Sequence, residues 1–313
     1  MIQIYIMMFQ IFVCGVVGFF LRKQRVIDER TEKSLTEILL QAVLPFSIIA
    51  SSQYMYSAEL VKGMLGVALA AALYYCSTLV IMRMVLHSRR ANAKANTDEI
   101  RVMMTTIIFA NTGFLGLPLM EALFGASGLL LGAIYNIMFN IFFYTFGVHT
   151  LSGVKFQFRE LFLNPVTAAS VIAVILFLLP FRIPAFLLST INLIGNMTIP
   201  LAMIIAGSIF STVDFRKFFG DIKPVIVSLM RLLILPAITF ALVYVIRMFI
   251  PMLKETACVI VMMTALPCGI MNVMIAEREN KAPKFAARTV VMSLVFMLLT
   301  LPVFAFLCVK FFY

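Results

Sequence analysis

Asparagine, threonine, glycine and proline interrupt an apolar stretch that is otherwise long enough to cross a membrane. Residues 102–125 read VMMTTIIFANTGFLGLPLMEALFG. Five interrupting residues lie at its centre: Asn111, Thr112, Gly113, Gly116 and Pro118. Glycine weakens a helix interior and proline removes a backbone donor, but Pro118 suits the first turn of a second helix. Two half-helices meeting in mid-membrane leave unpaired N–H groups, which favour a carboxylate, whereas the alternative is one continuous helix with a proline kink.

A second apolar stretch is interrupted in the same way near the other end of the chain. Residues 264–276 read TALPCGIMNVMIA, with Pro267, Gly269 and Asn272 inside the run. Interrupted spans at corresponding places in two halves of a chain are the best sequence indicator of a transporter binding site. The two stretches together therefore favour a site over a kink, with Gly116, Pro118, Pro267 and Gly269 as the helix breaks.

Four asparagines in these regions could serve the site. The amides of Asn111 and Asn272 donate and accept, so they could orient a ligand, or they could only cap the broken helices. Asn136 and Asn140 lie one turn apart and could face the same cavity, or they could form hydrogen bonds between helices. We select Asn111, Thr112, Gly113, Asn272 and Asn140 as candidate substrate-binding residues.

Arg231 is a cation well inside an apolar span, eight residues after Lys223. A charge at such depth is a functional candidate, and Arg231 joins the substrate-binding set as a group that attracts an anion. Its alternative role is to snorkel toward the cytoplasmic surface, about 12 Å away along the helix.

Acidic residues are scarce inside the spans. Of the 14 Asp and Glu, almost all fall in loops or at span ends, and Glu121 is placed at a span end. Because proton-coupled carriers usually need a buried titratable group, we expect uniport driven by the membrane potential, or coupling through backbone and amide groups.

The composition is that of a polytopic membrane protein. The chain has 313 residues, 63% of them hydrophobic, and a mean hydropathy of +1.05. The length accommodates about ten helices of roughly 20 residues. We predict spans near residues 3–21, 34–52, 60–86, 100–123, 127–150, 164–180, 185–211, 223–249, 255–277 and 286–312.

The net charge of +11 is explained by topology and requires no nucleic acid as partner. Alternate loops hold most of the 25 Lys and Arg: Arg22, Lys23, Arg25, Arg30, Lys33, Arg83, Arg89, Arg90, Lys94, Arg101, Lys155, Arg159, Arg216, Lys217, Lys223, Arg278, Lys281, Lys284 and Arg288. Positively charged loops stay in the cytoplasm, so both termini of this multi-pass plasma-membrane protein should be extracytoplasmic.

An even division of the spans gives residues 1–150 and 164–313, with five helices in each half. Because five is odd, the second copy would be inverted in the membrane. The predicted fold is an all-α membrane protein of two inverted five-helix repeats, in which broken fourth and ninth helices cross at their centres.

These motifs resemble those of the auxin efflux carrier family of transporters, over essentially the whole chain. They are Asn111-Thr112-Gly113 with Gly116-Leu117-Pro118-Leu119, Ala265-Leu266-Pro267 with Gly269 and Asn272, and Asn164-Pro165. The resemblance implies a scaffold of spans 1, 2, 6 and 7, against which spans 3–5 and 8–10 move, with the architecture of bile acid sodium symporters. It also implies a homodimer through the scaffold. The loop between the fifth and sixth spans is short, as in compact microbial members, which are mostly described as permeases for malate or similar organic acids.

The leading interpretation is thus a secondary transporter that moves a small organic anion by alternating access through the lipid bilayer. A channel or sensor on the same fold is the alternative, because filters also use broken helices. An intramembrane enzyme and an ATP-driven pump lack their motifs. The five cysteines show no metal-ligand spacing, and we expect no metal and no cofactor.

Overall fold

The computed structural model describes residues 2–90, 97–153, 163–179, 181–212 and 222–313. Five basic residues of the predicted cytoplasmic loops lie outside the described residues: Lys94, Lys155, Arg159, Arg216 and Lys217. Within the described part the chain is helical, so the all-α expectation is confirmed.

The helices are named in chain order, with π-helical turns marked η. The first half contains α1 (Ile2–Lys23), α2 (Glu29–Ile38), η1 (Leu39–Val43), α3 (Leu44–Ser51), α4 (Ala58–Arg90), α5 (Thr97–Ile108), η2 (Thr112–Gly116), α6 (Leu117–Phe142), η3 (Phe143–Gly147) and α7 (Val148–Ser152). The second half contains α9 (Pro165–Leu178), α10 (Ala185–Gly195), α11 (Thr198–Ser211), α12 (Ile222–Leu229), η5 (Met230–Ile234), α13 (Leu235–Phe249), α14 (Lys254–Thr264), α15 (Ile270–Arg278) and α16 (Pro283–Phe312).

Six helical segments among the described residues are long and apolar enough to cross a membrane. They are 29–51, 58–85, 112–152, 185–211, 222–249 and 283–312. The third of them changes direction at Gly125, whose φ of 63° and ψ of −153° are not helical. That turn lies where the fourth predicted span ends and the fifth begins. The ten-helix count and the inversion of the repeats remain predictions.

Three π-helical turns directly precede a Leu-Pro pair. Pro45 follows η1, Pro118 follows η2 and Pro236 follows η5. A proline lacks the N–H of a regular helical bond, and its ring clashes with the carbonyl of the preceding turn. A wider turn relieves the clash, so the helix continues through the proline.

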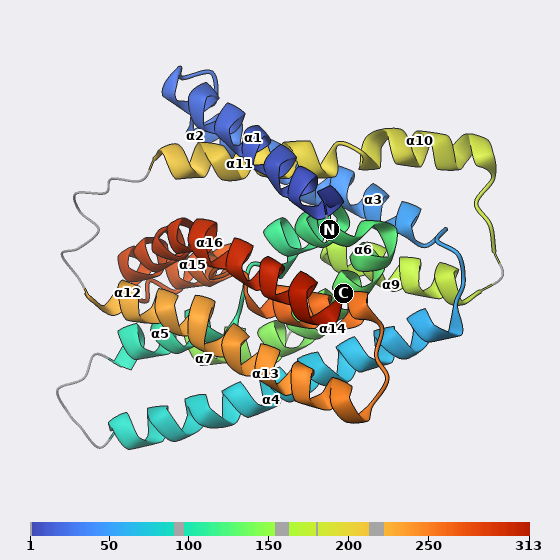
Figure 1. Ribbon diagram of the computed structural model, residues 1–313. Helices are drawn as coiled ribbons and strands as arrows, with labels where there is room; N and C mark the ends of the chain where they lie inside the picture. The colour runs from blue at the N-terminus through green and yellow to red at the C-terminus, as the bar shows by residue number, and fades with distance from the viewer. Residues whose placement is uncertain (1, 91–96, 154–162, 180, 213–221) are drawn as a thin grey trace.

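The helix contacts define two groups, which meet where α6 contacts α3 and α9, and Figure 1 shows α1, α10 and α11 along one side and α4 and α13 along the opposite side. In one group α1 lies along α11, while α3 packs against α9 and α10. In the other, α14 packs against α6, α13 and α16, and α4 packs against α6. The first group contains the spans that the family resemblance assigns to the scaffold, and movement between the groups remains a prediction.

Glycines allow α1 and α11 to approach at backbone distance. A Cβ added at Gly207 would overlap the carbonyl group of Gly15, and one at Gly18 would overlap that of Ile204. Small residues at such contacts are characteristic of helix packing in membranes, where close backbone approach replaces a hydrophobic driving force.

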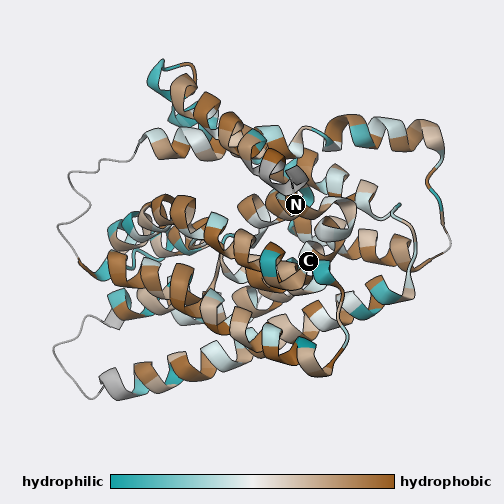
Figure 2. Cartoon of the chain, in the orientation of Figure 1, coloured by the Kyte–Doolittle hydropathy of each residue, from teal (hydrophilic) through white to brown (hydrophobic). Residues whose placement is uncertain are grey.

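The outward faces of the helices are largely hydrophobic, as Figure 2 shows. Leu65, Leu69 and Leu73 on α4 and Phe249 on α13 are more than three-fifths exposed. Large exposed apolar side chains along a helix are expected where lipid, not water, is the solvent.

Candidate functional site

Two unwound segments, one from each half of the chain, pair through their backbones. Residues 109–111 separate α5 from η2, and residues 265–269 separate α14 from α15. The N–H of Asn111 donates to the carbonyl of Pro267 at 2.9 Å, and the N–H of Gly269 donates to that of Phe109 at 3.0 Å. Ala110 and Cys268 form the antiparallel bridge between these bonds. We call this pairing the crossing.

The residue types at the crossing suit a close backbone contact. A Cβ at Gly269 would lie 2.8 Å from the carbonyl oxygen of Ala110, which is backbone and cannot swing away. Pro267 has no N–H, so only its carbonyl needs a partner, and Asn111 supplies one. Gly269 thereby lets the two backbones pair, and Pro267 leaves one fewer N–H in need of a partner, as an unwound segment inside the membrane requires.

The first break lies earlier than the sequence pattern indicates. The chain is already turning at Thr112, and Pro118 lies within the first two positions of α6, so Gly116 and Pro118 are not at the break itself. The π-helical turn η2 accommodates the proline, as described above. A Cβ at Gly116 would lie 2.7 Å from a methyl group of Leu266, so this glycine allows the two broken helices to pack closely.

Asn272 ties the two halves together through its side chain. Its Nδ2 donates to the carbonyl of Phe109 at 3.1 Å and to that of Gly269 at 3.0 Å. The residue is fully buried, and its Oδ1 has no hydrogen-bond partner. Asn272 therefore ties the start of α15 to the end of α5 and keeps an acceptor without a partner at the crossing.

The other predicted asparagines divide into two sets. Thr112 donates to Oδ1 of Asn136 at 2.8 Å, which brings α6 onto the start of η2, and a Cβ at Gly113 would lie 3.7 Å from the same oxygen. Asn140, in contrast, donates to Thr167 of α9 at 2.8 Å. Asn136 thus joins the crossing, while Asn140 makes the interhelical contact that the sequence left open.

Donor groups without partners accumulate around the crossing. Nδ2 of Asn111 and Nδ2 of Asn136 are buried and make no hydrogen bond. The first N–H groups of a helix lack the regular intrahelical acceptor, and no side chain caps η2 or α15, although the N–H of Asn272 donates to the carbonyl of Gly269 at 3.1 Å. Helix starts carry partial positive charge, so this arrangement is suited to hold an anion.

Arg231 points into the crossing and is fully buried. Its Nε donates to the carbonyl of Leu266 at 3.0 Å, and its Nη1 donates to the carbonyls of Ile107 and Ile108 at 3.1 and 3.2 Å and to the hydroxyl of Tyr74. Backbone carbonyl oxygens of both unwound regions hold the guanidinium inside the protein, so in this structure it does not extend toward either end of its span.

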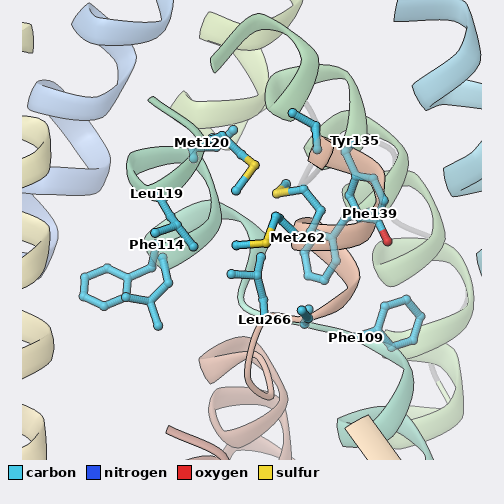
Figure 3. Packing of buried hydrophobic residues seen from close by; sticks show 14 of the residues in the cluster. Phe109, Phe114, Leu119, Met120, Tyr135, Phe139, Met262 and Leu266 are labelled. Carbon is cyan, nitrogen blue, oxygen red and sulfur yellow. The ribbon is translucent and has the colours of Figure 1, made fainter. Parts of the chain in front are cut away.

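A cavity of about 330 Å³ lies beside the crossing, between α1 and α11 on one side and the broken helices on the other. Leu115, Leu119 and Met262 are among its lining residues, which are all apolar or glycine. Figure 3 shows Met120, Met262 and Leu266 among the packed apolar side chains of the core. The polar groups of the crossing do not line this cavity and are covered by protein.

Glu121 lies near the end of the fourth predicted span, four residues before the turn at Gly125, yet part of its carboxyl group is buried. It lies in α6, inside the apolar segment 112–152, and its Oε1 accepts a hydrogen bond from Ser47 of α3 at 2.6 Å. Its Oε2 is buried without a partner. The pairing of Glu121 with a serine 74 residues away carries no local sequence signal.

The fold and the crossing define an integral membrane protein organised around two interrupted helices, an arrangement typical of membrane carriers. The family of membrane transport proteins, which comprises the auxin efflux carriers, matches residues 3–155 and again residues 148–305, and the chain belongs to this family. The chain is also 23% identical over 296 residues to an uncharacterized transporter of Methanocaldococcus jannaschii, a match that covers 91% of this chain and 92% of the relative. The family resemblance stated from the motifs is confirmed, and the protein is a multi-pass membrane transporter.

Proposed function

We propose that the protein is a secondary transporter for a small organic anion, a carboxylate such as malate, which binds at the crossing. The single observation that carries this proposal is the set of buried donors without partners. Asn111 and Asn136 each offer a buried amide nitrogen without a partner, and the starts of η2 and α15, which no side chain caps, add partial positive charge. A carboxylate would satisfy them, because it accepts several hydrogen bonds and complements the positive helix ends.

Burial of these groups supports alternating access. Asn111 is 6% exposed and Asn272 is fully buried, so a substrate reaches them only if neighbouring helices move apart. The groups that contain α3 and α6 meet beside the crossing, and relative movement there would open it to one side of the membrane at a time. A permanently open channel would instead require its polar groups to line a continuous aqueous path.

The proposal places the protein in the plasma membrane, with both termini extracytoplasmic because alternate loops hold most of the Lys and Arg. It also retains transport driven by the membrane potential. An anion carrier without an obligatory co-ion moves net charge, so an imposed potential should drive uptake.

Reconstitution in liposomes tests the proposal. Uptake of labelled malate would be measured under an imposed potential for the wild type and for the Asn111→Ala, Asn272→Ala double variant. The matched control is Asn140→Ala, because Asn140 is equally buried but donates to Thr167, away from the crossing. Thermal unfolding of each variant in detergent verifies that it folds.

We expect saturable wild-type uptake with counterflow, at least tenfold slower uptake in the double variant, and wild-type affinity in Asn140→Ala. Equal uptake in wild type and double variant would reduce both asparagines to caps. Non-saturable flux without counterflow would favour the channel alternative. If the folded wild-type protein does not take up malate, malate is excluded as the substrate.

A further inference from the structure

Arg231 occupies the place where the carbonyl ends of both interrupted helices converge. Ile107 and Ile108 are the last residues of α5, and Leu266 follows the end of α14 by two residues. The last four carbonyls of a helix have no intrahelical partner, and that end carries partial negative charge. One guanidinium donates to the carbonyls of both ends, through its Nε to one helix and its Nη1 to the other.

The charge of Arg231 is balanced by dipoles. None of the ion pairs among the described residues involves Arg231. Its other contacts are with Tyr74, whose hydroxyl also donates to the carbonyl of Ile108 at 3.2 Å and whose ring centroid lies 5.9 Å from Cζ of the arginine. A fully buried cation surrounded by carbonyl oxygens and an aromatic hydroxyl has the coordination chemistry of a bound alkali-metal ion.

Carriers that couple to sodium commonly bind it with unwound backbone carbonyls and half-helix C-terminal ends. We propose that Arg231 is a tethered cation that fills this position, so that the crossing assembles, and anion transport proceeds, without sodium. The inference rests on the proposed carrier function. Arg231 is on this view a positioning residue, which holds two helix ends and adds one fixed positive charge beside the anion donors.

Chemical rescue tests the position of the cation without any transport substrate. Arg231→Ala would remove the guanidinium and leave the carbonyls of Leu266, Ile107 and Ile108 without this donor. We expect a thermal midpoint several degrees below that of the wild type. Guanidinium chloride at about 1–20 mM should restore most of that shift by re-occupying the carbonyl site, whereas choline chloride at equal ionic strength should not.

Arg247→Ala is the matched control, because Arg247 lies on α13 of the same span and also donates to a backbone carbonyl, that of Phe312 at 3.2 Å. Arg247 has no contact with the crossing among its described bonds, so guanidinium should not stabilise its variant. Equal stabilisation of Arg231→Ala and Arg247→Ala by guanidinium would overturn the proposal.

A second measurement uses the unmodified protein and stays decisive if Arg231→Ala does not fold. Wild-type uptake in liposomes should change by less than twofold when sodium is replaced by choline on both sides at constant potential. A tenfold or greater dependence on sodium would overturn the proposal. If malate is not taken up but guanidinium rescues Arg231→Ala, the tethered cation stands and only the proposed substrate fails.

Discussion

Asn272 donates a hydrogen bond from its side-chain amide to the carbonyl oxygen of Phe109, 163 residues earlier in the chain, at 3.1 Å. The bond joins the start of α15 to the end of α5, so it links the second half of one broken helix with the first half of the other. Both residues are buried, so a donor or acceptor that loses this bond would lie unsatisfied away from bulk solvent. The crossing is thus held by side-chain amide as well as by backbone pairing.

Asn272→Asp should disrupt the crossing. The aspartate keeps the shape of the side chain but replaces the donor nitrogen with an oxygen that faces the carbonyls of Phe109 and Gly269. Leaving buried groups unsatisfied costs about 1–3 kcal/mol, and a negative charge would repel the proposed anion. The midpoint temperature of thermal unfolding and the rate of uptake should both be lower than in the wild type. Asn140→Asp should lose stability with little change in substrate affinity. An equal loss of affinity in Asn272→Asp and Asn140→Asp would contradict the placement of Asn272, and not Asn140, at the binding site.

Gly269→Ala and Gly113→Ala should differ sharply in stability. The added methyl group at Gly269 would lie 2.8 Å from the carbonyl oxygen of Ala110, so the paired segments must separate. Overpacking of this kind costs about 1–3 kcal/mol. At Gly113 the nearest neighbour of the added Cβ would be Oδ1 of Asn136 at 3.7 Å, an ordinary contact. The thermal midpoints of the two variants would be compared in the same detergent. Equal midpoints would show that the crossing can accommodate an added methyl group at Gly269.

Glu121→Gln tests whether transport uses a proton. Glutamine keeps an oxygen that can accept from Ser47, the hydrogen bond that Glu121 makes at 2.6 Å. Because we expect transport driven by the potential, uptake by this variant should stay within about twofold of wild type with the same dependence on pH. Loss of uptake in a variant that unfolds at the wild-type temperature would instead assign proton coupling to Glu121.

Gly207→Ala should loosen the contact of α11 with α1. Its Cβ would overlap the carbonyl of Gly15, and backbone on both sides leaves no room to adjust. Gly66→Ala is the control, since its added methyl group would meet the side chain of Thr256 at an ordinary 3.6 Å. We expect a thermal midpoint several degrees lower for Gly207→Ala and little change for Gly66→Ala. A lower midpoint for Gly66→Ala than for Gly207→Ala would exclude close backbone contact as the basis of the packing of α1 against α11.

Local sequence pattern was sufficient for the membrane class and for the existence of two interrupted helices. Long apolar runs predict spans because only helices satisfy the backbone in lipid. Pro267 and Gly269 predicted the second break at its observed place, since a missing donor and a missing side chain are properties of the residues themselves. Asn164 and Pro165 likewise mark a helix start, where the asparagine accepts from the N–H groups of Val166 and Thr167.

Tertiary structure decided where the first break lies and what the polar residues contact. A π-helical turn carries the chain through Pro118, so the proline does not mark the break. The partners of Arg231 lie 35 and more than 120 residues away in the chain, and Ser47 lies 74 residues from Glu121. Hydrogen bonds between such distant residues depend on how the helices pack, and no periodicity or spacing within one span records that packing.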